Sequence, residues 1–265
     1  MFDRYNRSIN YLRISVTDRC NLRCTYCMPE DGIRLLDHSD ILSYEEIADF
    51  TRIAVANGIT KVRLTGGEPL VRKGIVDLVS LLAQIDELEE LSMTTNGVLL
   101  SKYAFDLKKA GLNRINISLD TVNPENYCQI TRNGELSQVL EGIEAARKAG
   151  LKPIKINCVL LGQPDKETLY LKNFCEERGL KLRFIHQMNL KTGEFSTVEG
   201  GEGGNCSKCN RVRLLANGDI KPCLFSDFAY NIRKLGTQKA LDLALNNKPR
   251  SGTYNQSGEF YNIGG

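Results

Sequence analysis

The run Cys20-Asn21-Leu22-Arg23-Cys24-Thr25-Tyr26-Cys27 forms a Cys-x3-Cys-x2-Cys motif directly after a strand-like segment, residues 11–16. Three thiolates on one short loop can hold three corners of a four-iron cluster and leave one iron open for chemistry. Zinc is the alternative, but it needs a fourth ligand, and His38 and His186 do not form a ligand-spaced pair. A disulfide framework is less favoured, because nine cysteines is an odd number.

The composition is that of an ordinary globular protein. With 265 residues, 42% of them hydrophobic and 25% charged, the chain can bury one sizeable core and a small second module. The net charge of +3 is too small to indicate a nucleic-acid or membrane partner. No run of about 18 apolar residues occurs, and residues 1–4 lack the apolar region of a signal peptide. We therefore expect a cytoplasmic protein whose thiols are reduced.

Strand-like and helix-like segments alternate after the cysteine motif. Ser43 and Glu46 form a capping box that begins a helix ending at Gly58. Six strands are predicted at residues 11–16, 61–65, 90–95, 113–119, 155–160 and 181–188, and further helices at 75–85, 102–110, 136–149 and 166–178. This alternation predicts an α/β fold with parallel strands and right-handed crossovers.

The cysteine motif resembles, residue for residue, the signature of the radical S-adenosylmethionine (SAM) superfamily, in which an aromatic residue such as Tyr26 precedes the last cysteine. The resemblance implies a partial (β/α)6 TIM barrel and a 4Fe-4S cluster that binds SAM and is held by Cys20, Cys24 and Cys27. It further implies SAM contacts from Tyr26, Gly67, Ser118 and Met188. Taken singly, Gly67 would mark a turn and Met188 would fill the core.

The pattern changes after residue 188. A glycine-rich linker covers residues 189–205, so we expect residues 1–188 to be the barrel and 189–265 to comprise the linker, a hairpin module and a tail. Strands at 212–216 and 219–223 flank Asn217-Gly218, which predicts a type I′ turn. Residues 246–265 are polar and rich in glycine and serine, which is typical of a tail.

A second set of cysteines, Cys206, Cys209 and Cys223, lies around this hairpin. The hairpin can bring Cys223 beside the other two, and three thiolates without a histidine fit a second 4Fe-4S cluster better than zinc. This makes the hairpin a small C-terminal auxiliary iron–sulfur cluster module. The remaining cysteines, Cys128, Cys158 and Cys175, are isolated and are expected to be buried apolar residues.

The Cys-x2-Cys-x13-Cys spacing and the terminal Gly264-Gly265 resemble the branch of the superfamily that cyclises GTP in molybdenum-cofactor biosynthesis. That resemblance implies a second cluster that binds guanine and a glycine tail that reaches the active site. It implies GTP contacts from Arg13, Arg63, Thr94, Lys155, Arg211, Val212 and Arg213, with catalytic roles for Arg13, Arg211 and Arg213. Each cation alone could be a surface charge, but together they favour an anionic substrate.

The implied reaction converts GTP to 3′,8-cyclo-7,8-dihydro-GTP through a 5′-deoxyadenosyl radical. The implied partners are a reductant protein of flavodoxin or ferredoxin type, a downstream cyclic pyranopterin monophosphate synthase and a second copy of the chain. This chain departs from the branch in its short linker, residues 189–205. That departure favours, as an alternative, another radical SAM enzyme with an auxiliary cluster that acts on a peptide or a different nucleotide. A non-catalytic metal-binding or RNA-binding protein is the alternative outside enzymes.

Overall fold

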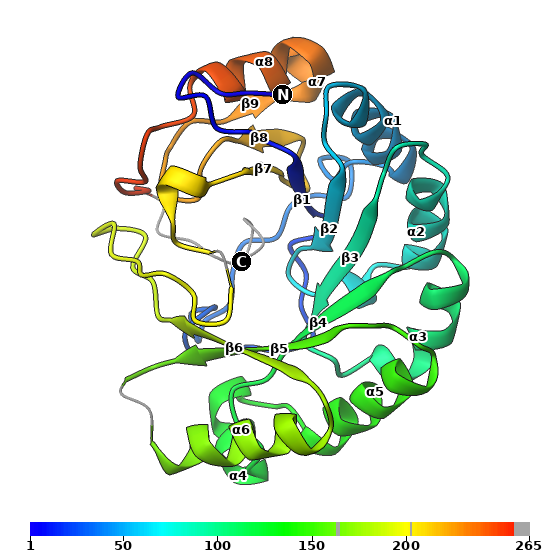
Figure 1. The fold of residues 1–265 in the computed structure, drawn as a ribbon, viewed down its shortest axis with the longest axis vertical. Coiled ribbons are helices and arrows are strands. Elements are labelled where there is room, and N and C mark those ends of the chain that lie inside the picture. The colour runs from blue at the N-terminus through cyan, green and yellow to red at the C-terminus, as the bar shows by residue number, and fades with distance from the viewer. Residues whose placement is uncertain (163–164, 202, 257–265) are drawn as a thin grey trace.

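The computed structural model describes residues 1–162, 165–201 and 203–256. Six parallel strands run in the order in which they occur in the chain. They are β1 (Tyr11–Ser15), β2 (Lys61–Thr65), β3 (Glu90–Thr95), β4 (Arg114–Ser118), β5 (Ile154–Leu160) and β6 (Lys181–His186). The sheet curves into an open arc with helices on its convex side (Figure 1), which confirms the predicted partial barrel.

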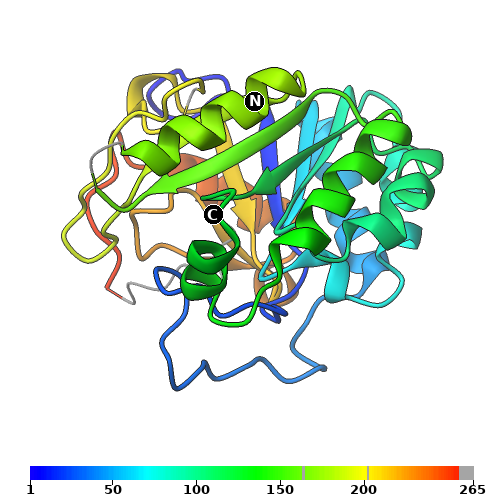
Figure 2. The same ribbon diagram turned by 90° about the horizontal axis from the view of Figure 1, so that it is seen from below.

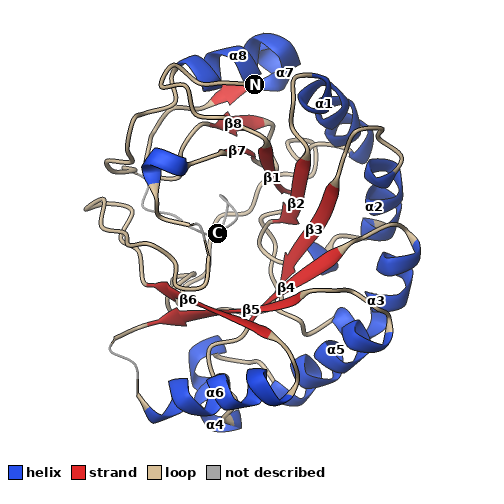
Figure 3. Ribbon diagram, in the orientation of Figure 1, coloured by secondary structure: helices blue, strands red, loops and turns tan. Residues whose placement is uncertain are grey.

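The helices between the strands confirm the predicted alternation, with ends shifted by a few residues. They are α1 (Tyr44–Ala56), α2 (Ile75–Ala83), α3 (Leu100–Lys109), α4 (Pro124–Thr131), α5 (Leu136–Lys148) and α6 (Lys166–Glu177), with a short 3-10 helix η1 (Pro69–Val71). The sequence reading did not predict α4. Figure 3 shows these helices outside the strands, so the sheet's concave face is left for the site.

Three further strands extend the sheet beyond β1. They are β7 (Arg211–Leu214), β8 (Asp219–Lys221) and β9 (Tyr230–Asn231). β7 pairs in parallel with β1, whereas β7–β8 and β8–β9 are antiparallel. The predicted hairpin is therefore confirmed, and it continues the barrel's own sheet. The division into residues 1–188 and 189–265 stays a prediction.

The turn of this hairpin differs from the predicted type I′. That type needs a positive φ at both central residues. Gly218 has φ 86°, but Asn217 is not among the described residues with positive φ. The side chain of Asn217 instead accepts a hydrogen bond from the amide of Asp219 at 3.1 Å. This local Asx bond favours a four-residue turn, which the Gly218 amide closes by donating to the Leu215 carbonyl at 3.0 Å.

Side chains along the inner strands alternate between the hydrophobic core and the concave face of the sheet. In β1, Leu12 and Ile14 are 0% exposed and belong to the core, whereas Tyr11 and Arg13 line a cavity. In β7 the core residues are Val212 and Leu214, and Arg211 and Arg213 line the same cavity. Successive strand side chains point to opposite faces, so basic residues spaced by two gather on one face.

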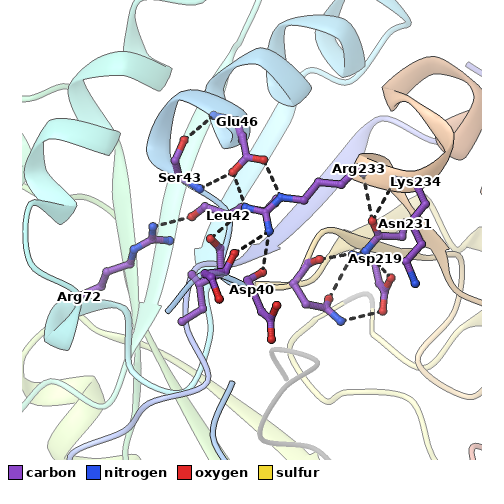
Figure 4. A network of polar contacts seen from close by, with 12 residues as sticks. Asp40, Leu42, Ser43, Glu46, Arg72, Asp219, Asn231, Arg233 and Lys234 are labelled. Carbon is purple, nitrogen blue, oxygen red and sulfur yellow. Dashed lines mark hydrogen bonds and ion pairs between the residues drawn. The ribbon is translucent and has the colours of Figure 1, made fainter. Parts of the chain in front are cut away.

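A polar network fixes the long segment that leads from the cysteine loop to α1. Residues 28–42 run as an extended loop on one side of the molecule (Figure 2). The predicted capping box of Ser43 and Glu46 is present. Arg233, in α7 (Ile232–Leu235), pairs with Glu46 at 2.7 Å and donates to the carbonyls of residues 39–41 (Figure 4). The far end of the segment is thus anchored to α7, which is distant in sequence.

The last described residues pack onto the sheet extension. α8 (Thr237–Asn246), which the sequence reading missed, follows α7. The amide of Thr253 donates to the Phe225 carbonyl at 3.1 Å, and that of Asn255 to the Leu190 carbonyl at 2.8 Å. The predicted tail is therefore held as far as residue 256, and Gly264-Gly265 lie outside the described residues. In the part of the chain that is described, no helix has the length and apolar character to span a bilayer.

Candidate active site

The first cavity, about 220 Å³, lies where the carboxyl ends of the inner strands meet the cysteine loop. Its lining includes the three cysteines and the other residues predicted to contact SAM: Cys20, Cys24, Cys27, Tyr26, Gly67, Ser118 and Met188. Thr94, predicted to contact GTP, also lines this cavity. The structure therefore gathers on one cavity wall seven residues that are spread over the sequence from 20 to 188.

The chemistry of the first thiol triplet fits an iron–sulfur cluster. Burial raises the pKa of Cys24 to about 12 and that of Cys27 to about 11, so a cationic metal centre is needed to keep them as thiolates. The Cys20 sulfur accepts from the Leu22 amide at 3.4 Å and from the Asn96 side chain at 3.8 Å. Hydrogen bonds to sulfur are among the features that tune such clusters.

The glycine turn after β2 packs directly on the backbone that precedes the cysteine loop. The amide of Gly67 donates to the Thr17 carbonyl at 2.7 Å, and that of Glu68 to the Arg19 carbonyl at 2.8 Å. A Cβ on Gly67 would lie 2.3 Å from the Arg19 carbonyl oxygen. Glycine is thus required at position 67 because the backbone before the cysteine loop packs against it. This is a second reason for glycine, besides the predicted close contact with SAM.

Two carboxylates that the sequence reading missed, the buried Glu68 and the half-buried Asp120, fix the residues around this cavity. Glu68 accepts from the Thr95 hydroxyl at 2.7 Å and from the Asn96 amide at 2.7 Å, and burial raises its pKa to about 7. Asp120 accepts from the Tyr26 hydroxyl at 2.8 Å and from the Val159 amide at 2.7 Å. A carboxylate within three residues of a strand's carboxyl end, where the predicted barrel has its functional face, was the signal that could have found both.

The second cavity, about 520 Å³, carries the other cysteine triplet. Cys206, Cys209 and Cys223 all line it, on the walls formed by the short helix η2 (Cys206–Lys208) and the β7–β8 hairpin. It shares three lining residues with the first cavity: Asn157, Ile185 and Met188. The two triplets therefore border adjoining cavities on the concave side of the sheet.

Cations dominate this second cavity. Its lining, within the described residues, includes eight basic side chains: Arg13, Lys61, Arg63, Arg114, Lys155, Arg183, Arg211 and Arg213. Glu90 is the single carboxylate among these lining residues, and it pairs with Arg114. Five of the eight were predicted to contact GTP; Lys61, Arg114 and Arg183 were not. For Lys61, its spacing of two from Arg63 along β2 was the available signal.

Several of these cations are buried without an opposing carboxylate. Arg63 and Arg213 are each 6% exposed, and neither forms an ion pair in the described chain. Burial lowers the pKa of Arg63 to about 9 and that of Arg13 to about 10. The Nε atoms of Arg13 and Arg213 are buried and have no hydrogen-bond partner among the described residues. Burying such cations is unfavourable unless an anion pairs with them.

Other predicted residues lie elsewhere. Val212 is 0% exposed, and its side chain belongs to the core. Cys158 and Cys175 are buried as predicted, but Cys128 is exposed. That prediction was wrong because Cys128 lies in α4, whose buried residues are Tyr127 and Thr131.

The second cavity also lies deeper in the arc than the predicted functional face. Tyr11, Lys61 and Glu90 begin their strands and line it. The cationic space therefore reaches the amino ends of the strands, whereas the sequence reading placed the motifs at the carboxyl ends.

The fold and the three-cysteine loop define a class of protein. The family model for the Radical SAM superfamily matches residues 14–175. The class implies a 4Fe-4S cluster and SAM as cofactors. Within it, the chain belongs to the GTP 3′,8-cyclase family. The GTP 3′,8-cyclase of Petrotoga mobilis is 46% identical over 281 residues, covering 88% of this chain and 86% of the relative. Those of Moorella thermoacetica and Geobacter sulfurreducens are 44% and 42% identical, at the same shares of each chain.

Solved structures share the fold at low sequence identity. Streptococcus suis SuiB bound to S-adenosylmethionine has a TM-score of 0.65 at 18% identity, over 92% of this chain and 65% of SuiB. The protein anSMEcpe with bound AdoMet has a TM-score of 0.67 at 15% identity, over 90% of this chain and 81% of its own. These likenesses concern the fold alone.

Proposed function

We propose that this protein is a GTP 3′,8-cyclase that converts GTP to 3′,8-cyclo-7,8-dihydro-GTP in molybdenum-cofactor biosynthesis. One observation carries the proposal: a cavity with eight basic side chains and one carboxylate among its described lining residues adjoins the cavity of the first cysteine triplet. A nucleoside triphosphate is the kind of anion that so many cations can bind. The names of the relatives support the same substrate.

The first cavity would hold the cofactors. Cys20, Cys24 and Cys27 would ligate a 4Fe-4S cluster, and Tyr26, Gly67, Ser118 and Met188 would contact SAM. When bound, this pair supplies the 5′-deoxyadenosyl radical that removes hydrogen from C3′ of GTP. Glu68 fixes the position of the glycine turn against β3, and Asp120 fixes the Tyr26 ring through its hydroxyl. The protein thus contributes binding and orientation, and the cofactors contribute the reactive chemistry.

The second cavity would hold GTP. Arg63, Lys155, Arg211 and Arg213 would bind phosphate oxygens, because a guanidinium can donate two parallel charge-assisted bonds. Arg13, Arg211 and Arg213 would stabilise charge that develops on the nucleotide, and Thr94 would approach it from the first cavity. Val212 would take part only through its backbone, since its side chain is in the core. Cys206, Cys209 and Cys223 would ligate a second 4Fe-4S cluster beside the guanine.

Further parts of the proposal concern partners and organisation. A reductant of flavodoxin or ferredoxin type would supply electrons, and a cyclic pyranopterin monophosphate synthase would consume the product. The protein would act in the cytoplasm, as a possible homodimer, with residues 1–188 as barrel and 189–265 as auxiliary module.

One observation favours a second candidate, a radical SAM enzyme with an auxiliary cluster but another substrate. The alignment with the Petrotoga mobilis relative spans 281 positions, more than the whole 265-residue chain, of which it covers 88%. The relative therefore carries residues that this chain lacks, and we place them in the linker at residues 189–205. A shorter wall could admit a peptide or a different nucleotide.

Anaerobic turnover with SAM, reductant and GTP deuterated at C3′ tests the proposal. The product is an isomer of GTP, because the nucleotide loses a hydrogen atom and regains a proton and an electron. We expect deuterium to appear in 5′-deoxyadenosine and the isomer to separate from GTP by chromatography. Arg213→Met should abolish the isomer, whereas Lys208→Met, an exposed change near the same cysteines, should not. Uncoupled 5′-deoxyadenosine without deuterium would contradict GTP as the substrate.

A further inference from the structure

Lys248 is a buried ammonium group behind the second cysteine triplet. The residue is 1% exposed, although lysine is rarely buried without a charge partner. Its Nζ donates to the Arg211 carbonyl at 2.7 Å and to the Pro222 carbonyl. In the part of the chain that the structure describes, no carboxylate lies within ion-pair distance of it. A buried cation held only by two carbonyls is unfavourable unless a negative group lies nearby.

The two carbonyls belong to the segments that carry the cysteines. Arg211 lies two residues after Cys209, and Pro222 directly precedes Cys223. One ammonium group therefore joins both arms of the β7–β8 hairpin next to their sulfur ligands. Lys248 does not line the second cavity, so it supports the cavity wall from behind and does not touch a substrate there.

Arg7 extends this connection to the third cysteine. Its guanidinium donates to the Cys206 carbonyl at 2.7 Å and to the carbonyls of Pro249 and Arg250 at 2.7 and 2.9 Å. Asp3 orients it through an ion pair of 2.7 Å. Residues 248–250 and Arg7 thus tie together all three segments that bear the second triplet.

We infer that Lys248 is a positioning residue and built-in countercharge for an anionic iron–sulfur cluster at Cys206, Cys209 and Cys223, which rests on the proposed second cluster. A 4Fe-4S core of charge 2+ with three thiolates carries a net charge of −1, and one added electron makes it −2. A fixed cation nearby stabilises the cluster and favours its reduction. The missing negative partner of Lys248 is then the cluster itself.

The test uses the full chain with Cys20, Cys24 and Cys27 replaced by serine, so that only the second triplet can bind iron. In this parent, Lys248→Met removes the charge, and Lys248→Gln removes it but keeps N–H donors for the carbonyls. Lys208→Met is the matched control. Lys208 lies between Cys206 and Cys209, and its side chain is exposed to solvent. Reconstituted iron per chain and the midpoint potential from an anaerobic redox titration are measured.

We expect both Lys248 variants to reduce the equilibrium constant for one-electron reduction of the cluster about tenfold. This corresponds to a midpoint potential that is about 59 mV more negative. Lys208→Met should change it less than about twofold, because solvent screens its charge. If Lys248→Met does not fold, Lys248→Gln decides the result. A potential unchanged in the Lys248 variants that still bind about four irons would overturn the inference. A parent that binds no iron would instead overturn the proposed second cluster, and the inference with it.

Discussion

Replacing Arg63 with methionine should stabilise the ligand-free protein and weaken GTP binding at the same time. Arg63 is 6% exposed, and its nearest polar partner is the Ser92 hydroxyl, 3.4 Å from Nε. Burial lowers its pKa to about 9, well below the ordinary value of arginine, which disfavours the charged form by about 5 kcal/mol. The substitution also removes side-chain packing and the cation–π contact of Arg63 with Tyr11, at 5.3 Å, and this loss costs about 2–3 kcal/mol of stability. A net gain of about 2 kcal/mol remains.

The sign of this effect depends on pH in a defined way. The folded pKa of Arg63 lies below the unfolded value, so the unfolded chain binds more protons between pH 9 and 12.5. The destabilisation is therefore fully present below pH 9 and disappears as the pH rises to 12.5. At neutral pH the methionine variant should show the whole gain.

Two measurements check the prediction. Thermal unfolding of cluster-free protein should show a rise in Tm of about 4–8 °C for Arg63→Met. Anaerobic calorimetry with GTP should show binding about 10- to 100-fold weaker, because charge-assisted hydrogen bonds to phosphate are lost. Arg114→Met is the control, since Arg114 lines the same cavity but pairs with Glu90. It should lower Tm by leaving that carboxylate unpaired. A lower Tm in both variants, with unchanged GTP affinity for Arg63→Met, would refute the reasoning.

Three other perturbations address different parts of the molecule. Burial lowers the pKa of Lys155 to about 8, so GTP affinity should fall as the pH rises through 8, and Lys155→Met should remove this dependence in a Kd-versus-pH series. Cys223→Ser should reduce iron from about eight to about four per chain while 5′-deoxyadenosine formation continues, as iron analysis and chromatography would show. Arg233→Ala breaks the pair with Glu46 and should lower stability by about 1 kcal/mol without changing the Kd for GTP, whereas Arg52→Ala, in an exposed pair, should change neither.

Local signals in the sequence were sufficient for the six alternating strands and their helices, and the family resemblance supplied their arrangement as a partial barrel. The capping box at Ser43 and the glycines after the helices fixed the element ends to within a few residues. The extension of the sheet by β7 could not be predicted from local signals, because the pairing of β7 with β1 joins residues 200 positions apart. α8 was missed although Ala240, Leu241, Ala244 and Leu245 give it an apolar face.

The same contrast applies to the site. The cysteine triplets could be read from spacing alone, because short loops carry their ligands. The cationic cavity depends on which strand face is concave, and that follows from the curvature of the whole sheet. Lys61 and Arg183 share the face of Arg63 and Lys155, but their role appears only when the strands are placed together. Lys248 carried no sequence signal, since its partners are two backbone carbonyls distant in the chain.

The polarity of the two cavities gives the direction in which a nucleotide would bind. Cations surround the second cavity, so under the proposed function the triphosphate would bind there. Towards the first cavity the lining becomes neutral, where Asn157 and Thr94 carry buried oxygens without hydrogen-bond partners among the described residues. The Asn157 carbonyl oxygen can accept a hydrogen bond from a ribose hydroxyl, and the Thr94 hydroxyl can donate to or accept from one; neither group carries the positive charge that favours phosphate. The sugar would therefore face SAM at the junction of the cavities, which is the arrangement that hydrogen abstraction from C3′ requires.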